Sequence, residues 1–243
     1  MKPTHPWHGT PLGRKVLWFG SVEFAVPSMP TVGSGTLVGT EGDDVIVGFL
    51  GRGLKIFGSG GDDRICGGLG FDRIFGEGGN DHLSGGGDGD NLYGGDGNDR
   101  LVGGLGRDEL HGDEGVDALF GGHHDDFLEG GSESDLLAGQ GGNDDLYGFE
   151  GDDVASGGPG NDKLFGGADD DLLAGGSGDD RLSGGDGDDE LDGGSGSDRL
   201  FGGPHDDELD GGPGEGDKIF NGGPGSDICR GKANIRLGCE KGK

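Results

Sequence analysis

Residues 94 to 102 read GGDGNDRLV, and this nine-residue stretch decides the fold because the chain repeats it almost without interruption. Between Gly58 and Asp210 the sequence divides into 17 consecutive units of nine, most of which follow the pattern Gly-Gly-x-Gly-x-Asp-x-Leu-x. A pattern that stays in phase over so many copies is typical of repeat architectures, in which each unit packs on its neighbours. The chain is therefore predicted to form one elongated array.

The composition is too poor in apolar side chains for an ordinary hydrophobic core. Of 243 residues, 66 are Gly and 28% are hydrophobic, and 48 Asp and Glu against 18 Lys and Arg give a formal net charge of −30. This charge makes nucleic acid and anionic membranes poor partners and cations obvious ones. No run approaches the ~20 apolar residues of a membrane-spanning helix. If the chain folds, something besides apolar burial must stabilise it.

Each position of the unit has its own physical role. Glycine at positions 1, 2 and 4 allows a sharp turn through positive φ and turns backbone carbonyl oxygens inward. Positions 7 to 9 form a short strand, in which side chain 8 points to one side and side chains 7 and 9 point to the other. Position 8 is Leu or Ile in every unit except at Ala155, so it is the one regular core residue.

These roles predict the fold. Two units make one 18-residue coil of turn, strand, turn and strand, and successive coils stack at ~4.8 Å. The array then has about 8.5 coils and a length of roughly 40 Å. The predicted fold is all-β: a parallel β-roll, or right-handed β-solenoid, of 18-residue coils.

The sixth position is aspartate in every unit of the array. With the glycines, it makes the pattern resemble the RTX (hemolysin-type) calcium-binding nonapeptide repeat, as found in small secreted bacterial calcium-binding proteins. The resemblance implies Ca²⁺ in the turns, because Ca²⁺ takes about 6 to 8 oxygen ligands from carboxylates and backbone carbonyls. It also implies that each ion is shared by position 6 of two stacked turns, as in Asp63 with Asp81 and Asp72 with Asp90. Such pairs give about 15 Ca²⁺ ions.

The candidate metal ligands are the position 6 aspartates and the carbonyl oxygens of the turns. The aspartates are Asp44, Asp63, Asp72, Asp81, Asp90, Asp99, Asp108, Asp117, Asp126, Asp135, Asp144, Asp153, Asp162, Asp171, Asp180, Asp189, Asp198, Asp207 and Asp227. The turn carbonyls are represented by those of Gly67, Gly85, Gly94, Gly103, Gly157, Gly175, Gly184 and Gly193.

Degenerate units flank the array on both sides. GTEGDDVIV at 39–47 is a weaker copy, and the unit at 48–57 is damaged, with Lys55 where Asp belongs. After Asp210, GGPGEGDKIF carries one extra residue, and GGPGSDICR closes the array at Arg230. The expected organisation is an N-terminal segment of unclear structure (1–35), a coil with degenerate repeats (36–57), the β-roll (58–230) and a C-terminal cap (231–243).

The fold is expected to depend on the metal. One core residue in nine gives too little apolar burial to offset the ordering of a glycine-rich backbone, and stacked carboxylates repel one another. Ion binding must then supply folding free energy. We therefore expect the metal-free chain to be largely disordered and to fold when Ca²⁺ is added.

The outward side chains sort by sheet, because successive units alternate between two sheets. At position 9 one face collects Phe75, Tyr93, Tyr147, Phe165 and Phe201, and we expect Phe220 to continue this row. Aromatic residues at these positions can shield the strands and favour β structure. Alternatively, they form a contact surface for self-association, or for a polysaccharide or protein partner.

The N-terminal and C-terminal segments of the sequence lie outside the regular repeats and support different expectations. The resemblance implies that Cys229 and Cys239 form a disulfide that caps the stack, in an oxidising compartment, while Cys66 stays unpaired at an outward position. The segment after Arg14 resembles a degenerate signal peptide. KVLWFGSVEFAVPSMP (15–30) also resembles the first strand and loop of formyltransferases acting on methionyl-tRNA, over too short a stretch to carry that activity. A mis-set start is a further interpretation of this segment.

The sequence indicates a binding protein and no catalytic residues. It holds no H-E-x-x-H zinc motif, no G-x-S-x-G elbow and no phosphate-binding loop. The predicted function is calcium binding by a secreted, extracellular β-roll with a structural or interaction role. The alternatives are a binding module that uses the aromatic face, and the calcium-binding part of a larger secreted enzyme or toxin.

Overall fold

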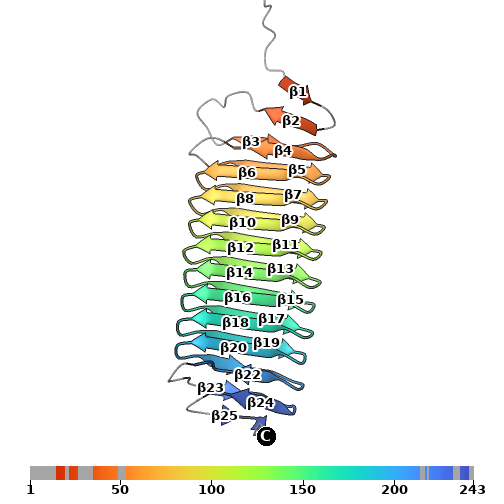
Figure 1. Cartoon of the computed structure of the whole chain (residues 1–243). Helices are drawn as coiled ribbons and strands as arrows, with labels where there is room; N and C mark the ends of the chain where they lie inside the picture. The colour runs from red at the N-terminus through yellow and green to blue at the C-terminus, as the bar shows by residue number, and fades with distance from the viewer. Residues whose placement is uncertain are drawn as a thin grey trace, which may run out of the picture.

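The chain winds as a β-solenoid. The computed structural model describes residues 15–19, 22–26, 35–48, 53–213, 217, 219–231 and 236–240. Every regular element among them is a β-strand, and the strands form two sheets. From β3 onward, successive strands alternate between the two sheets, and the coils stack into a rod (Figure 1). The predicted all-β roll of stacked coils is confirmed.

The two sheets differ slightly in size. The larger sheet contains, in spatial order, β1 (Lys15–Phe19), β2 (Val22–Val26), β4 (Asp44–Val47), β6 (Arg64–Leu69), β8 (His82–Gly87), β10 (Arg100–Leu105), β12 (Ala118–His123), β14 (Leu136–Gly141), β16 (Val154–Pro159), β18 (Leu172–Ser177), β20 (Glu190–Ser195), β22 (Glu208–Asp210), β24 (Asp227–Arg230) and β26 (Cys239–Glu240). The smaller sheet contains β3 (Thr36–Val38), β5 (Lys55–Gly60), β7 (Arg73–Gly78), β9 (Asn91–Asp96), β11 (Glu109–Glu114), β13 (Phe127–Ser132), β15 (Asp145–Glu150), β17 (Lys163–Ala168), β19 (Arg181–Asp186), β21 (Arg199–Phe201), β23 (Ile219–Asn221) and β25 (Arg236–Leu237).

The register keeps equivalent positions directly above one another. In the regular array each strand pairs in parallel with the strand 18 residues away, so that Leu101 pairs with Leu83 on one side and with Leu119 on the other. Because the period is constant, every position of the unit forms a row along the rod. The aspartates of position 6 and the apolar residues of position 8 therefore each form continuous rows along the regular array.

The core is a file of position 8 side chains between the two sheets. These side chains are at most 5% exposed, and the neighbours at positions 7 and 9 face outward, as predicted. Ala155 leaves the smallest side chain in the file. The file consists of Ile46, Ile56, Ile65, Ile74, Leu83, Leu92, Leu101, Leu110, Leu119, Leu128, Leu137, Leu146, Ala155, Leu164, Leu173, Leu182, Leu191, Leu200, Leu209, Phe220 and Cys229.

Phe220 does not continue the outward aromatic row, and that expectation is wrong. Leu200 pairs with Phe220 and Phe201 pairs with Asn221, so Phe220 occupies position 8 and is fully buried. The unit that begins at Gly211 contains two extra residues, not one. Beyond them, the strand register again places an apolar side chain, Phe220, at this level of the core file.

The damaged unit also differs from the expectation, because Lys55 does not occupy the aspartate position. Lys55 pairs with Arg73 at position 7 and is exposed, and Ile56 follows it in the core file. Leu54 stands at position 6 and is only 7% exposed. The extra residue of this unit lies earlier in the turn, so an apolar side chain replaces the carboxylate.

The two ends of the rod are built differently. β1 and β2 form an antiparallel pair, and β2 joins β4 in parallel, so this pair extends the larger sheet (Figure 1). β1 and β2 contain most of the apolar stretch that resembles a signal peptide, and the rest of residues 1–34 lies outside the described residues. No helix among the described residues is long and apolar enough to cross a membrane.

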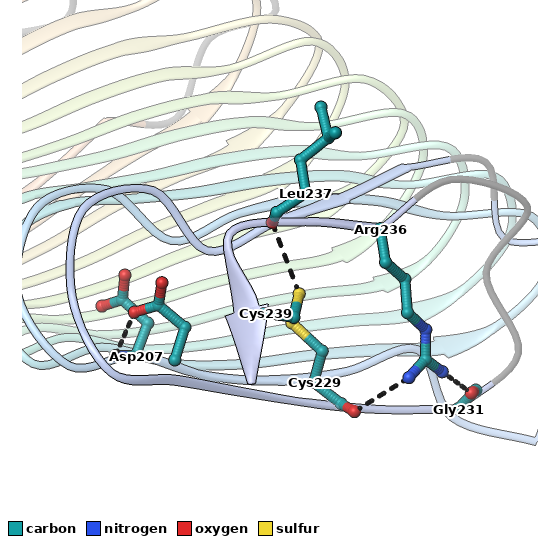
Figure 2. Close-up of a disulfide and its surroundings, with 7 residues drawn as sticks. Asp207, Cys229, Gly231, Arg236, Leu237 and Cys239 are labelled. Atoms are coloured by element: carbon teal, nitrogen blue, oxygen red, sulfur yellow. Dashed lines mark hydrogen bonds between the residues drawn. A yellow bond between two sulfur atoms is a disulfide. The ribbon is translucent and has the colours of Figure 1, made fainter. Parts of the chain in front are cut away.

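At the other end, Cys229 and Cys239 form a disulfide, as the resemblance implied (Figure 2). Cys229 occupies position 8 of the last complete unit, and Cys239 lies on β26, which pairs with β24. The Arg236 guanidinium donates to the carbonyl oxygens of Cys229 and Gly231 and so ties β25 to the end of β24 (Figure 2). Cys66 is unpaired and half-buried.

Adjacent leucines at the middle of the rod provide a test of the core. Leu137 is fully buried and Leu136 is 43% exposed. Leu137→Ala should lower the free energy of unfolding by about 2 to 5 kcal/mol, because it leaves a cavity in the file. Leu136→Ala should change it by less than about 1 kcal/mol. Chemical denaturation in saturating Ca²⁺ measures both values, and equal losses would contradict the assigned register.

Candidate metal sites in the turns

The turns use glycine for two different reasons. Positions 2 and 4 have positive φ, as at Gly95 (110°) and Gly97 (128°). Position 1 does not lie in the left-handed region, as at Gly94, so the prediction of positive φ is wrong there. What excludes a larger residue at position 1 is the lack of space.

The space beside position 1 glycines such as Gly103 and Gly175 contains oxygens from two successive coils. A Cβ atom on Gly103 would lie 2.5 Å from the Asp108 Oδ2 atom and 2.6 Å from the Gly121 carbonyl oxygen. At Gly175 the corresponding distances are 2.5 Å to Asp180 Oδ2 and 2.7 Å to the Gly193 carbonyl oxygen. A carboxylate oxygen and a carbonyl oxygen therefore converge at the same place in the turn.

All eight glycines that the sequence proposed as carbonyl ligands lie against the aspartate of their own unit. For Gly85, Gly94 and Gly193, the carbonyl oxygen also lies next to the position 1 glycine of the preceding coil. Beside the preceding glycine, the carbonyl oxygen of one coil thus lies close to the aspartate side chain of the coil before it. This is the kind of mixed donor set that Ca²⁺ accepts.

The position 6 aspartates are linked from coil to coil. Asp81 donates its backbone N–H to Asp99 Oδ1 at 2.7 Å, and Asp99 donates its own to Asp117 Oδ1 at 2.6 Å. The predicted pairs, such as Asp63 with Asp81 and Asp72 with Asp90, are joined in this way. Eighteen such links are described, from Asp44 with Asp63 to Asp207 with Asp227, at 2.6 to 3.4 Å.

The second oxygen of each carboxylate is buried without a hydrogen-bond partner. For Asp44 this atom is Oδ1, and for the others it is Oδ2. All of these side chains are at most 3% exposed. Burying an ionised carboxylate oxygen without a partner is costly, so a cation or a proton is required there. The residues are Asp44, Asp63, Asp72, Asp81, Asp90, Asp99, Asp108, Asp117, Asp126, Asp135, Asp144, Asp153, Asp162, Asp171, Asp180, Asp189, Asp198, Asp207, Asp217 and Asp227.

Asp217 belongs to this set, although the sequence analysis did not select it. It is fully buried, and Asp198 donates its backbone N–H to Asp217 Oδ1 at 3.4 Å. One of the two extra residues of its unit precedes Asp217, so Asp217 is the seventh residue of the unit rather than the sixth, and the other lies between Asp217 and Phe220. The available sequence signal is an aspartate shortly before an apolar residue, but Asp217 lies three residues before the core residue Phe220. In the regular units that separation is two.

Burial raises the pKa of most of these carboxyl groups, because the charged form loses its hydration. The pKa rises to about 8 for Asp117 and Asp126, where charged neighbouring aspartates add to the effect of burial. It rises to about 7 for Asp63, Asp90, Asp135, Asp153, Asp171, Asp180, Asp189 and Asp207. It rises to about 6 for Asp99, Asp108, Asp144 and Asp198.

In several turns a residue other than glycine occupies position 2 or position 4, where the backbone has positive φ. Five non-glycine residues at position 4 have positive φ, between 69° and 86°. They are Asp88, His124, Glu133, Asp169 and His205. Position 2 adds Ser59, Glu77, Asp113, Gln140 and Phe149 to this group. A side chain with positive φ costs conformational energy, so these turns are less favourable than the all-glycine turns.

The sites draw on few side chains. No group of three His, Cys, Asp or Glu side chains suited to a metal occurs in the described ranges. Each turn instead combines two aspartates from stacked coils with backbone carbonyl oxygens. Hard oxygen donors of this kind fit Ca²⁺ rather than zinc, which prefers nitrogen and sulfur ligands.

A parallel β-roll whose turns present buried aspartates and converging carbonyls defines a class of calcium-binding repeat protein. The chain belongs to the RTX calcium-binding nonapeptide repeat family, which matches residues 31–52, 57–92, 93–123, 124–154, 147–182 and 183–217. Repeats of this family bind calcium. A search of the curated proteins found no match to the chain.

The crowding at position 1 gives a direct test of the turn. Gly103→Ala places a methyl group against Asp108 Oδ2 and the Gly121 carbonyl, and it should raise the Ca²⁺ concentration needed for folding severalfold. Gly141→Ala is the matched control, because a Cβ there approaches nothing closer than 3.9 Å and Gly141 does not need positive φ. Circular dichroism during a Ca²⁺ titration measures both midpoints. The same midpoint for the two variants would contradict this account of the turn.

The raised pKa values predict how the metal-free roll responds to pH. Because the folded carboxyl groups bind protons more tightly than unfolded ones, their contribution to stability is complete below about pH 4 and is lost as pH rises through about 6 to 8. In excess chelator, the chain should therefore show more β structure at about pH 5 than at about pH 8. Ca²⁺ must displace these protons, so its folding midpoint should rise as pH falls. Circular dichroism at the two pH values tests both expectations.

Proposed function

We propose that this protein is an extracellular calcium-dependent β-roll that folds when Ca²⁺ binds in its turns and then serves a structural or interaction role. The observation that carries the proposal is the row of buried aspartates, each with one carboxylate oxygen that has no partner. In this proposal the position 6 aspartates and the position 1 carbonyls supply the ligands. The ion supplies the positive charge that lets adjacent carboxylates stack.

Charge and stoichiometry support this assignment. The chain has a net charge of −30, and its linked aspartate pairs lie along both edges of the rod. About 15 ions in the regular array would bring about +30, which is comparable with the net charge of the chain. Three further links, at Asp44 with Asp63, Asp198 with Asp217 and Asp207 with Asp227, extend the series at its ends. The turn at Leu54 has no carboxylate at position 6 and is proposed to bind no ion.

The proposed location follows from affinity and from the disulfide. Extracellular calcium modules bind at about 10⁻⁴ to 10⁻³ M, so their sites fill outside a cell and stay empty inside it. Folding would then follow export. The bond between Cys229 and Cys239 also supports an oxidising compartment. RTX repeat proteins are typically secreted, which agrees with both arguments.

The aromatic row of the smaller sheet bears on the interaction role. The rings of Phe57, Phe75, Tyr93 and His111 stack face to face at 4.8 to 5.0 Å, and Tyr147 and Phe165 do so at 4.9 Å. Their faces contact one another, so their edges and the Tyr hydroxyls are what a partner can meet. This favours mutual shielding over a platform on which sugar rings stack. A binding module that uses this row, or the calcium-binding part of a larger secreted enzyme or toxin, are the alternative roles.

Two adjacent aspartates test the proposed ligands. Asp153 is buried and linked to Asp135 and Asp171, whereas Asp152 is exposed at position 5. Asp153→Asn should remove about two ions, because each ligand is shared by two sites, and should raise the Ca²⁺ midpoint for folding. Asp152→Asn should change neither by much.

Isothermal titration calorimetry gives the stoichiometry of the two variants, and circular dichroism gives their folding midpoints. A wild-type chain that is fully β-structured in excess chelator at neutral pH would contradict calcium-dependent folding. An unchanged stoichiometry in Asp153→Asn would contradict the ligand assignment.

A further inference from the structure

The C-terminal coils carry opposite charges on their two outer faces. On the smaller sheet, Lys163, Arg181 and Arg199 stand at position 7 of consecutive strands, directly opposite one another. We call these three residues the basic row. All three side chains are exposed. They form a local positive strip on a chain whose net charge is −30.

The outer face of the larger sheet carries negative charge at the same level of the rod. Glu190 pairs with Glu208, and Asp192 pairs with Asp210, so four carboxylates lie together on its outer face. We call these four residues the acidic row. Like charges directly opposite each other in a sheet are destabilising. Both rows therefore cost stability in the isolated rod.

Contacts within the chain relieve this repulsion only in part. Lys163 bonds Asp145 at 2.9 Å, and Arg230 bonds Glu208. The Arg181 guanidinium lies over the Phe201 ring at 4.9 Å. Among the described residues, neither Arg181 nor Arg199 has a carboxylate partner within ion-pair distance. The rows thus keep unused charge that a partner can neutralise.

An apolar stripe adjoins the acidic row. Leu136, Val154 and Leu172 stand at position 7 of consecutive strands in the larger sheet and are 43%, 41% and 42% exposed. On the smaller sheet, Tyr147 and Phe165 occupy position 9 at the same level of the rod. Each face therefore combines an apolar segment with a charged segment, in the same order along the rod.

Strand direction determines how the two faces would meet. Neighbouring strands of the two sheets run in opposite directions (Figure 1). If a second copy is displaced sideways without rotation, position 7 of its larger sheet faces position 9 of the first copy's smaller sheet. Val154 and Leu172 then face Tyr147 and Phe165. By the same geometry, position 9 faces position 7, and Asp192 and Asp210 face Arg181 and Arg199.

We propose that the partner of these faces is a second copy of this chain, which packs the larger sheet of one rod on the smaller sheet of the next. Both faces belong to the same coils and repeat with the same spacing, so the charges match over successive strands. The contact uses two different surfaces, so it is heterologous and can continue from copy to copy. Nucleic acid does not fit, because the net charge of the chain is −30.

The proposal rests on the proposed calcium-dependent folding. Without bound Ca²⁺ the net charge keeps copies apart, and the rows are not assembled. With Ca²⁺ the aspartates of the turns are neutralised, and the charges on the outer faces then decide association. Because these ion pairs are exposed, salt should weaken the assembly.

Sedimentation of the full chain in Ca²⁺ tests the inference, with circular dichroism on the same samples to measure folding. The wild-type mass should rise above the 24.5 kDa of one chain as protein concentration increases. Arg181→Glu/Arg199→Glu should remain at one chain with an unchanged Ca²⁺ midpoint for folding, because both side chains are exposed. Glu190→Arg/Asp192→Arg should also stay at one chain. An equal mixture of the two variants should associate again, because each supplies the charge that the other lost.

Lys55→Glu/Arg73→Glu is the matched control. It makes the same change in net charge on the same sheet, but the facing side chains on β6 and β8 are the uncharged Cys66 and Ser84. This variant should associate as the wild type does. A folded wild-type chain that stays monomeric in Ca²⁺, or association that survives Arg181→Glu/Arg199→Glu, would overturn the inference. A chain that does not fold in Ca²⁺ would instead contradict the proposed function, and with it the rod on which association depends.

Discussion

The structure depends on one carboxylate that serves two coils. Apart from Asp44, and from Asp72, which accepts the N–H of Leu54 instead, the Oδ1 atom of each position 6 aspartate accepts the backbone N–H of the aspartate one coil earlier, as Asp117 does for Asp99. Its Oδ2 atom, on the same group, faces the turn with no partner. Cohesion between coils and the need for a cation therefore reside in the same side chain. The narrow core file cannot replace this interaction, because it provides one apolar side chain per unit.

Much of the surrounding sequence follows from placing that carboxylate inside a turn. Position 1 must be glycine because Asp Oδ2 and a carbonyl of the next coil occupy the space of a side chain, as at Gly103. Positions 2 and 4 bend the chain so that the carboxylate faces inward. Part of the acidic composition thereby becomes a regular series of buried aspartates, one in each turn of the array. Stability and metal binding are thus two aspects of one arrangement.

The periodic part of the chain could be predicted from sequence, and the irregular units could not. Constant spacing predicts that Asp99 lies in a turn and Leu101 in the core, and both are buried there. An inserted residue can lie anywhere in a unit, so the spacing alone did not reveal that Leu54 takes the aspartate position, that Phe220 enters the core, or that Asp217 joins the buried aspartates. Strand pairing decides these cases, because it requires an apolar side chain at each level of the file. The lack of space beside the position 1 glycines arises partly from carbonyl oxygens of the next coil. The sequence of a single unit therefore does not reveal it.

The two ends of the rod give it a direction. In a stack whose coils contact only their neighbours, opening begins at a terminal coil and spreads inward. The C-terminal coil is closed by the bond between Cys229 and Cys239, whereas near the other end Leu54 interrupts the column of aspartates. Loss of ions should therefore unzip the rod from its N-terminal side, coil by coil. Proteases that sample partly calcium-depleted molecules should accordingly trim the N-terminal coils and leave a disulfide-closed C-terminal fragment.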